Sequence, residues 1–197
     1  LNHVFDNFSQ TQREKVFAAK IIEFNEVWWF YPSASATEID RYVIYNYIDQ
    51  TWSIGVLERT AWSDSGVFAF PIAVDKTNKK AFNHELGSND DGSAMTAFIE
   101  TGFFNGDENG DNMIFIDKII PDTTFIEGNT IKFQLKSKRY PNDSETTKGP
   151  FSLTSSSTKL SMRARGRAFQ ARYSSDSTDT AWRLGTWRAN GQASGSR

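Results

Sequence analysis

Residues 26–55 read EVWWFYPSASATEIDRYVIYNYIDQTWSIG, and this stretch predicts three neighbouring β-strands. Val27 to Tyr31 is an apolar, aromatic run that ends at Pro32-Ser33. Tyr42 to Tyr47 is rich in β-branched and aromatic residues, and Trp52 to Leu57 follows a short polar turn. Such runs are typical of strands, and short turns join antiparallel neighbours. The stretch therefore predicts an antiparallel meander.

The middle strand carries bulky side chains at both odd and even positions. Tyr42, Ile44 and Asn46 alternate with Val43, Tyr45 and Tyr47. Because successive side chains point to opposite faces of a sheet, we expect this strand to lie inside a sheet that is packed on both sides. A strand, strand, turn, strand pattern with a Trp near the hairpin is also typical of one blade of a β-propeller.

Further strands are expected along the rest of the chain, separated by turns rich in Asp, Asn, Gly and Ser. They are predicted at 67–73, 80–84, 97–104, 112–119 and 130–138. Ser9 to Gln12 fits a capping box that opens one short helix to about Phe17. The predicted fold class is all-β, with β-propeller-like or β-sandwich antiparallel sheets and one short N-terminal helix.

Three regions are expected within the 197 residues. Residues 1–140 form a β-rich body of propeller-like blades, 141–158 form a loop or linker, and 159–197 form a basic β-hairpin segment. The last region differs from the rest in its net charge. Residues 1–158 contain 14 Lys and Arg and 22 Asp and Glu, whereas residues 159–197 contain 8 Lys and Arg and 2 Asp and Glu. No run approaches the roughly 20 apolar residues of a membrane span, so no membrane span is expected.

The basic segment holds the sharpest candidate site, a row of arginines with two tryptophans among them. We predict subunit or nucleic-acid contacts at Arg163, Arg165, Arg167, Arg172, Arg183, Arg188, Trp182 and Trp187. Arginine beside tryptophan suits phosphate contact and stacking, and equally suits ion pairs with an acidic neighbour. A plain solvated face is the third interpretation.

The loop from 105 to 111 is rich in oxygen ligands. Asn105, Asp107, Asn109 and Asp111 resemble the start of a calcium-binding EF-hand loop, but Ile116 stands where its twelfth-position Glu is needed. An ordinary turn is therefore the preferred interpretation, and no metal site and no cofactor are predicted.

Recognisable catalytic motifs are missing from the sequence. There is no Gly-rich phosphate loop, no G-x-S-x-G and no H-E-x-x-H, and the chain has no Cys and only two His. Glu85, Asp90 and Asp91 could act as paired carboxylates of a glycosidase, but carboxylates are common in turns. We therefore expect a protein without catalytic residues.

Several motifs together resemble the late part of the podovirus-type tail nozzle, tubular tail hub or packaged-DNA stabilisation family of tailed bacteriophages. The resemblance runs through most of the chain, in the segments 26–33, 40–47, 51–55, 59–62, 84–87, 90–92, 106–111, 119–122 and 182–185 and the terminal Gly-Ser-Arg.

This resemblance implies a structural virion protein of the phage tail. Its subunits would form a ring, a hexamer in such proteins, that extends the tail tube, retains packaged DNA and lets it pass at ejection. Portal, adaptor and other tail proteins would be its partners, with transient non-specific contact to DNA. The alternative is a carbohydrate-binding β module of a virion or secreted protein, in which Trp28, Trp29, Trp52, Trp62 or Trp187 stacks on sugar rings.

Overall fold

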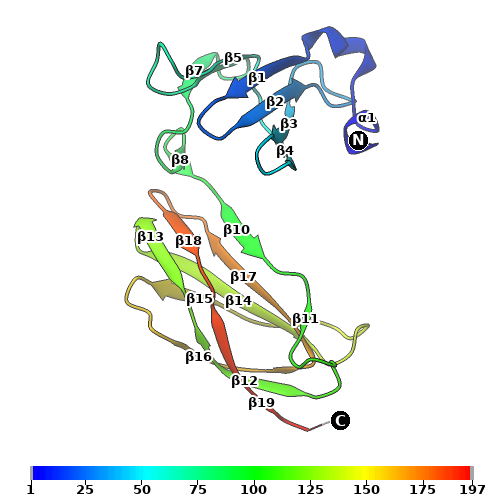
Figure 1. Cartoon of the computed structure of the whole chain (residues 1–197), viewed down its shortest axis with the longest axis vertical. Coiled ribbons are helices and arrows are strands. Elements are labelled where there is room, and N and C mark those ends of the chain that lie inside the picture. Colours follow the sequence, from blue (N-terminus) through cyan, green and yellow to red (C-terminus); the bar gives the residue numbers. More distant parts are fainter. Residues whose placement is uncertain (1, 196–197) are drawn as a thin grey trace. The chain divides into compact units, whose positions relative to one another are not determined.

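The structure, a computed structural model, describes residues 2–195, and its regular secondary structure consists almost entirely of β-strands (Figure 1). The all-β prediction is confirmed. The chain divides into two compact units, residues 1–86 and 87–197. Ser196 and Arg197 of the predicted basic segment lie outside the described residues. Among the described residues, no helix is both long and apolar enough to span a membrane.

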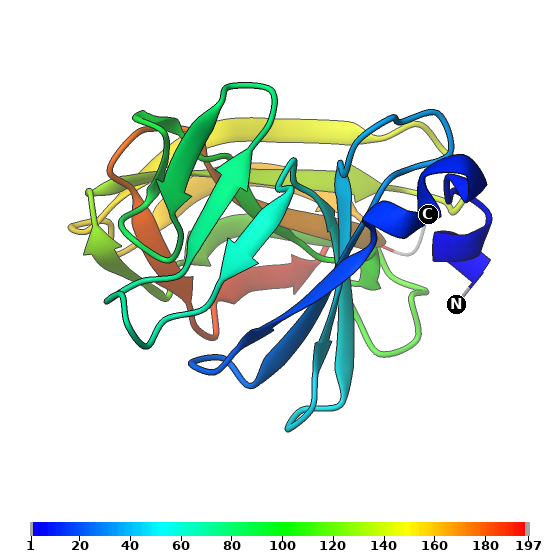
Figure 2. The same ribbon diagram turned by 90° about the horizontal axis from the view of Figure 1, so that it is seen from above.

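The first unit begins with two short helical turns and continues as strands. Its elements are α1 (Asn2–Phe5), the 3-10 helix η1 (Gln10–Lys15), β1 (Phe17–Ile21), β2 (Glu26–Tyr31), β3 (Arg41–Asn46), β4 (Thr51–Val56), β5 (Ala61–Ser63), β6 (Ile72–Asp75) and β7 (Lys80–Asn83). Strands β1 to β4 form one antiparallel sheet in chain order, and β5 to β7 form a second. Figure 2 shows β1 to β4, in blue to cyan, as a fanned meander.

The predicted meander is confirmed at β2, β3 and β4, and β1 extends it to the four strands that one propeller blade contains. One face of this sheet is partly covered by β5. There Phe30 is fully buried, and the ring of Trp62 from β5 stacks against Trp28 at 5.6 Å and Phe30 at 5.6 Å. The expectation that both faces of β3 are packed is wrong, because every residue of β3 is only partly buried and β4 is mostly exposed.

The expected N-terminal helix is also different in the structure. Ser9 makes no side-chain capping bond to the backbone, and its hydroxyl lies 3.3 Å from Thr11 Oγ1 instead. Gln12 has non-helical dihedral angles, so the turn does not propagate as an α-helix. At Phe17, where the helix was expected to end, β1 begins and pairs with β2. The predicted strand at 67–73 forms only from Ile72, as β6.

The two largest sheets of the second unit pack as a β-sandwich, and the described residues of this unit form twelve strands. They are β8 (Asn89–Asp90), β9 (Ser93–Ala94), β10 (Ala97–Glu100), β11 (Phe104–Asn105), β12 (Ile114–Ile120), β13 (Thr123–Glu127), β14 (Thr130–Lys138), β15 (Thr146–Thr154), β16 (Leu160–Gly166), β17 (Ala168–Ser175), β18 (Ala181–Leu184) and β19 (Arg188–Ala193). One sheet has the order β10-β17-β14-β15, with β11 also on β17, and another has the order β16-β12-β19.

The core of this unit draws on both sheets. Its buried cluster comprises Ile116, Ile119, Ile131, Phe133, Leu135, Leu153, Met162, Ala164, Phe169, Ala171 and Tyr173. Strand β14 matches its prediction at both ends, and Ile131, Phe133 and Leu135 alternate as buried residues with partly exposed lysines and Gln134. Period-two alternation with one apolar face is what directs such a strand into a sandwich.

Two expectations for the end of the chain are corrected. The segment 141–158, expected as a loop or linker, holds the nine-residue strand β15, which pairs with β14. The expected final hairpin of residues 159–173 with 180–188 does not form. The first arm is divided into β16, which pairs with β12, and β17, which pairs with β14 and β10, whereas β18 in the second arm pairs with β13. The chain crosses from one sheet to the other at Gly166-Arg167, where Arg167 N donates to Lys138 O at 2.8 Å.

Candidate functional site

The predicted arginine row is divided between the two sheets of the sandwich. Arg163 and Arg165 alternate on β16 with buried Met162 and Ala164, so they lie on the outer face of the β16-β12-β19 sheet. Arg172 alternates on β17 with buried Ala171 and Tyr173 and therefore lies on the outer face of the other sheet. The structure thus brings Arg163 and Arg165 together but separates them from Arg172.

The remaining arginines have different surroundings. Arg172 is engaged within the unit, because its Nη1 donates to Glu100 Oε2 at 2.6 Å and its guanidinium lies 4.1 Å from the ring centroid of Phe98. Arg167 lies over the ring of Tyr140 at 5.2 Å. Arg183 on β18 and Arg188 on β19 are exposed. Of the row, Arg163, Arg165, Arg183 and Arg188 are therefore the members at the surface.

The two tryptophans of the row belong to the core instead. Trp182 and Trp187 pack against the buried cluster of the sandwich, and Trp182 Nε1 donates to Ser175 Oγ at 3.0 Å. Trp187 lies beside Phe133 and Tyr173, with ring centroids 6.4 and 6.3 Å away. Neither ring is presented as an exposed stacking platform, so the expected tryptophan contacts of this segment are replaced by core packing.

The first unit carries an apolar strip on β4. Trp52, Ile54 and Val56 alternate along one face of this strand and are 62%, 54% and 66% exposed. We call these three residues the β4 strip. Strand β4 is an edge of its sheet, so its outer backbone groups have no neighbouring strand within the sheet. The sequence predicts this strand, but it does not show that the apolar face of the strand is uncovered.

The indole of Trp52 is held by two rings behind it. The ring centroid of Tyr45, its cross-strand partner on β3, lies 4.6 Å away, and that of Trp29 on β2 lies 6.0 Å away. Aromatic pairs on one sheet face restrict each other's side-chain rotation. Trp28, Trp29, Trp62 and Trp187 are partly buried, so Trp52 is the exposed member of the tryptophans considered for sugar stacking.

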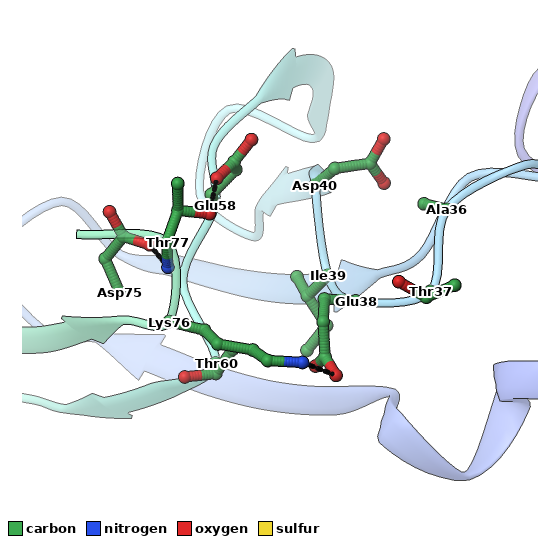
Figure 3. A pocket seen from close by; sticks show the side chains of 10 residues that line it. All are labelled: Ala36, Thr37, Glu38, Ile39, Asp40, Glu58, Thr60, Asp75, Lys76 and Thr77. Carbon is green, nitrogen blue, oxygen red and sulfur yellow. Dashed lines mark hydrogen bonds and ion pairs between the residues drawn. The ribbon is translucent and has the colours of Figure 1, made fainter. Parts of the chain in front are cut away.

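The first unit also contains an acidic cavity of about 440 Å³. Its lining includes Glu38, Asp40, Glu58, Asp75 and Lys76 (Figure 3). Such a group of carboxylates could in principle hold a cation or supply an acid and a base. This cavity is not evident from the sequence, because its residues come from three separate segments of the chain.

Each carboxylate around this cavity already has a protein partner. Glu38 pairs with Lys76 and, at 2.7 Å, with Lys15, and Figure 3 shows Lys76 reaching across to it. The hydroxyl of Thr77 donates to Glu58 at 2.6 Å. The other two carboxylates cap turns, since Asp40 accepts from Ser33 N at 2.7 Å and Asp75 accepts from Thr77 N at 2.7 Å.

The acidity of these carboxyls agrees with a structural role. Hydrogen bonds from Lys15 and Lys76 hold the pKa of Glu38 below its ordinary value. Burial opposes the ionisation of Asp75, but hydrogen bonds from Thr77 and Asn78 outweigh it and lower the pKa of Asp75 as well. A general acid at neutral pH needs a raised pKa. Within residues 2–195, no group of three or more His, Cys, Asp or Glu has a metal-binding arrangement.

In the loop considered for calcium binding, the carboxylate of Asp107 accepts hydrogen bonds from within the loop. Asp107 Oδ2 accepts from Asn112 N at 3.1 Å and from Asn112 Nδ2 at 2.8 Å. These bonds lower the pKa of Asp107, the bond from the Asn112 side chain most. Gly110 has a φ of +73°, a conformation that side chains rarely adopt, and a Cβ there would meet the Asn105 side chain. The loop is thus closed on itself as a turn.

The group considered for glycosidase chemistry does not lie within one unit. Glu85 belongs to the first unit, whereas Asp90 and Asp91 belong to the second, in the small β8-β9 hairpin. Burial, and then the nearby carboxylates of Glu23 and Glu26, raise the pKa of Glu85. The neighbouring His84 accepts a hydrogen bond at Nε2 from Arg59 Nε at 3.0 Å.

Comparison of the chain with known proteins gives no similarity on which a family can be assigned. No protein-family model matches it, and no curated protein matches it. The β4 strip and the arginines of β16 are therefore the two surfaces that bear on the function.

Proposed function

We propose that the protein is a structural subunit that assembles with copies of itself, in a phage tail nozzle or hub of the kind its sequence resembles. The ring would extend the tail tube, retain packaged DNA and let it pass at ejection. The β4 strip is the observation that carries the assembly part of this proposal. The resemblance alone supports the location in a virion and the portal and adaptor partners.

The β4 strip lacks the features that keep edge strands apart. Soluble proteins usually protect an edge with lysine, proline, a bulge or a covering loop, because unpaired backbone groups attract other strands. Strand β4 reads TWSIGV and carries none of the protecting residues. Its pairing with β3 is regular over all six positions. An uncharged, regular and exposed edge of this kind favours pairing with another chain.

A second copy of the same chain is the occupant that the sheet geometry favours. The sheet alternates strand direction from β1 to β4, and β1 is its other edge. Strand β1 of a second copy, placed beside β4, would continue the antiparallel alternation. It would bring Ala18 and Lys20 onto the face that holds the β4 strip. Such a head-to-tail contact is heterologous and generates a ring when its rotation closes.

The exposed arginines of β16 offer a second contact in this proposal. Arg163 and Arg165 would pair with an acidic surface of the next subunit, and Arg183 and Arg188 are available for the same purpose or for transient contact with DNA. Exposed ion pairs contribute little free energy each, about 0–1 kcal/mol, and are screened by salt. The arginines would therefore orient the subunits, while the apolar strip would supply most of the association free energy.

Light scattering on three proteins tests the proposal. The wild-type chain should form oligomers whose mass rises with concentration. Trp52→Lys should shift it to the monomer, because it removes the largest apolar side chain of the strip and adds a positive charge to the face on which Lys20 of the neighbouring β1 would lie. Val67→Lys is the matched control, since Val67 is 96% exposed but lies outside the strip. Monomeric wild-type protein at high concentration, or equal effects of both variants, would contradict the proposal.

A carbohydrate-binding module is the second candidate, and the exposure of Trp52 favours it. An indole that is 62% exposed and held by Tyr45 and Trp29 could stack on a sugar ring. In that case the wild-type chain would remain monomeric, and its tryptophan fluorescence would change on addition of oligosaccharides. Trp52→Ala would abolish that change.

A further inference from the structure

A second cavity, in the sandwich unit, has the opposite electrostatic character to the acidic one. It measures about 450 Å³ and is lined by Ser137, Arg139, Asp143, Ser144, Thr146, Lys148, Arg163 and Arg165. These residues come from the end of β14, the loop that follows, the start of β15 and the outer face of β16. Four lining residues are cationic and one is anionic, so the cavity gathers positive charge.

Most lysines and arginines nearby are neutralised, and those of the cavity are not. Lys136 pairs with Glu100 at 3.2 Å, and Lys138 pairs with Glu145 at 3.4 Å. By contrast, the side chains of Arg139, Lys148 and Arg163 have no ion-pair or hydrogen-bond partner among residues 2–195. Like charges brought close together repel, and a bound anion would relieve that repulsion.

The remaining polar groups of the cavity are also suitable for an anion. Arg165 is held in place, because its Nη2 donates to Ser194 O, while its other N–H groups are left for a ligand. The single carboxylate, Asp143, accepts from Ser144 N at 3.1 Å. The hydroxyls of Ser144 and Thr146 can donate to an oxyanion. An arginine fork binds two oxygens of a phosphate at once, and lysine adds a point charge.

We propose that this cavity is a phosphate-binding site, with Arg139, Lys148, Arg163 and Arg165 as its cationic groups. This site lies in the other unit from the β4 strip and goes beyond the proposed assembly function. It shares Arg163 and Arg165 with the second contact proposed there, so a bound phosphate and an acidic neighbouring subunit would compete for these two arginines. The ligand is either free phosphate or the phosphate group of a small monoester.

An adjoining cavity shows where the rest of a monoester would lie. It measures about 360 Å³, shares Arg139 with the phosphate site, and is lined by Phe103, Tyr140, Pro141 and Arg167 among others. Tyr140 is 56% exposed, and the guanidinium of Arg167 lies 5.2 Å from its ring centroid. A nucleobase could stack on such a ring. A nucleoside monophosphate would then place its phosphate by Arg139 and its base by Tyr140.

Calorimetric titration of the full chain at low ionic strength tests this site. Inorganic phosphate should bind saturably at one site per chain, and the double variant Arg163→Gln/Lys148→Gln should weaken binding at least about tenfold. Arg183→Gln/Arg188→Gln removes the same charge from exposed positions outside the cavity and should keep the wild-type affinity. Absence of saturable binding, or equal losses in the two double variants, would overturn the proposal.

Two further arms identify the ligand and separate this proposal from the assembly function. In the first arm, adenosine monophosphate is titrated in place of phosphate. The ligand is identified as a nucleotide if adenosine monophosphate binds more tightly than phosphate and Tyr140→Ala removes this difference in affinity. Equal affinities would identify free phosphate. Repeating the titration with Trp52→Lys should leave binding unchanged, because the strip and the cavity belong to different units. A failure of assembly is therefore detected by light scattering, and a failure of phosphate binding is detected by calorimetry.

Discussion

Arg172 on β17 and Glu100 on β10 are cross-strand partners whose side chains are joined by a 2.6 Å hydrogen bond from Nη1 to Oε2. Lys136 on β14 donates to the other oxygen of Glu100 at 3.2 Å, so one carboxylate links three adjacent strands. An arginine that the sequence presents as a contact residue is thus engaged in the ion-pair network of its own sheet.

Replacing Glu100 with Gln should make the sandwich less stable at neutral pH but not in acid. Hydrogen bonds from Arg172 and Lys136 hold the pKa of Glu100 below its ordinary value. A carboxyl whose pKa is lower in the folded state stabilises the fold fully at pH values above its unfolded-state pKa, which is about 4.3 for glutamate. This stabilisation is lost as the pH falls through the folded-state pKa. We expect a loss of up to about 1 kcal/mol at pH 7.

Urea unfolding of the wild type and Glu100→Gln at pH 7 and in acid measures this difference. Glu108→Gln is the control, because Glu108 is exposed on the loop that follows β11. A constant difference between the wild type and Glu100→Gln across this pH range would show that the ion pairs do not stabilise the fold.

Replacing Tyr173 with Phe should stabilise the sandwich. Tyr173 is 1% exposed, and its hydroxyl has no hydrogen-bond partner among the residues the structure describes. An unsatisfied buried hydroxyl is costly, so its removal should raise the free energy of unfolding by about 1 kcal/mol. The ring contact with Phe133, at 4.8 Å between centroids, is kept. Tyr140→Phe, at an exposed tyrosine, should change stability little.

The same substitution should alter the pH dependence in alkali. Burial raises the pKa of Tyr173. A raised folded-state pKa means that the stability contribution is intact below the ordinary tyrosine value, about 10, and falls as pH rises from there. Thermal unfolding should therefore show a widening advantage of Tyr173→Phe over the wild type above pH 10. Parallel curves would indicate that the hydroxyl is hydrated or bonded in solution.

Local alternation predicted the strands well but not the sheets to which they belong. Strand β14 was predicted at its observed bounds because its apolar residues repeat every second position. The same pattern at 159–173, which holds β16 and β17, predicted one arm of a hairpin with 180–188. Alternation reports which face of a strand is apolar, not which neighbours it pairs with. One local feature does mark the crossing of the chain from one sheet to the other. The buried residues have even numbers on β16 and odd numbers on β17, so the alternation is interrupted between the two strands.

The candidate sites, like the strands and sheets, could be predicted only in part from the sequence. The arginines of β16 were found from the sequence, because exposed charges between apolar residues identify a solvent face. The phosphate site was not found from the sequence. It forms only where the β14-β15 loop lies beside β16, and part of that loop had been predicted to belong to a linker. The exposure of the β4 strip was equally hidden, because an aromatic strand reads alike whether or not its apolar face is covered.

Replacing Gly55 with Val should disrupt the buried face of the first sheet. A Cβ at position 55 would collide with the phenol of Tyr42, which lies over this glycine and stacks on Trp28 at 4.7 Å. Overpacking of this kind costs about 1–3 kcal/mol. Urea unfolding should show this loss, and the tryptophan emission should shift as Trp28 moves. Ser53→Val, on the same face of β4, is the control and should be tolerated.

Replacing Arg59 with Lys should destabilise the first unit although the charge is kept. Arg59 is 7% exposed, and its Nε donates to His84 Nε2 at 3.0 Å while its Nη1 donates to Glu58 O at 2.9 Å. Its guanidinium lies 4.3 Å from the ring centroid of Phe82. Lysine cannot make both bonds and the ring contact from one position, so we expect a loss of about 2 kcal/mol. Arg13→Lys, at an exposed arginine of η1, should be neutral in the same denaturation experiment, and equal stabilities of the two variants would show that this buried guanidinium is dispensable.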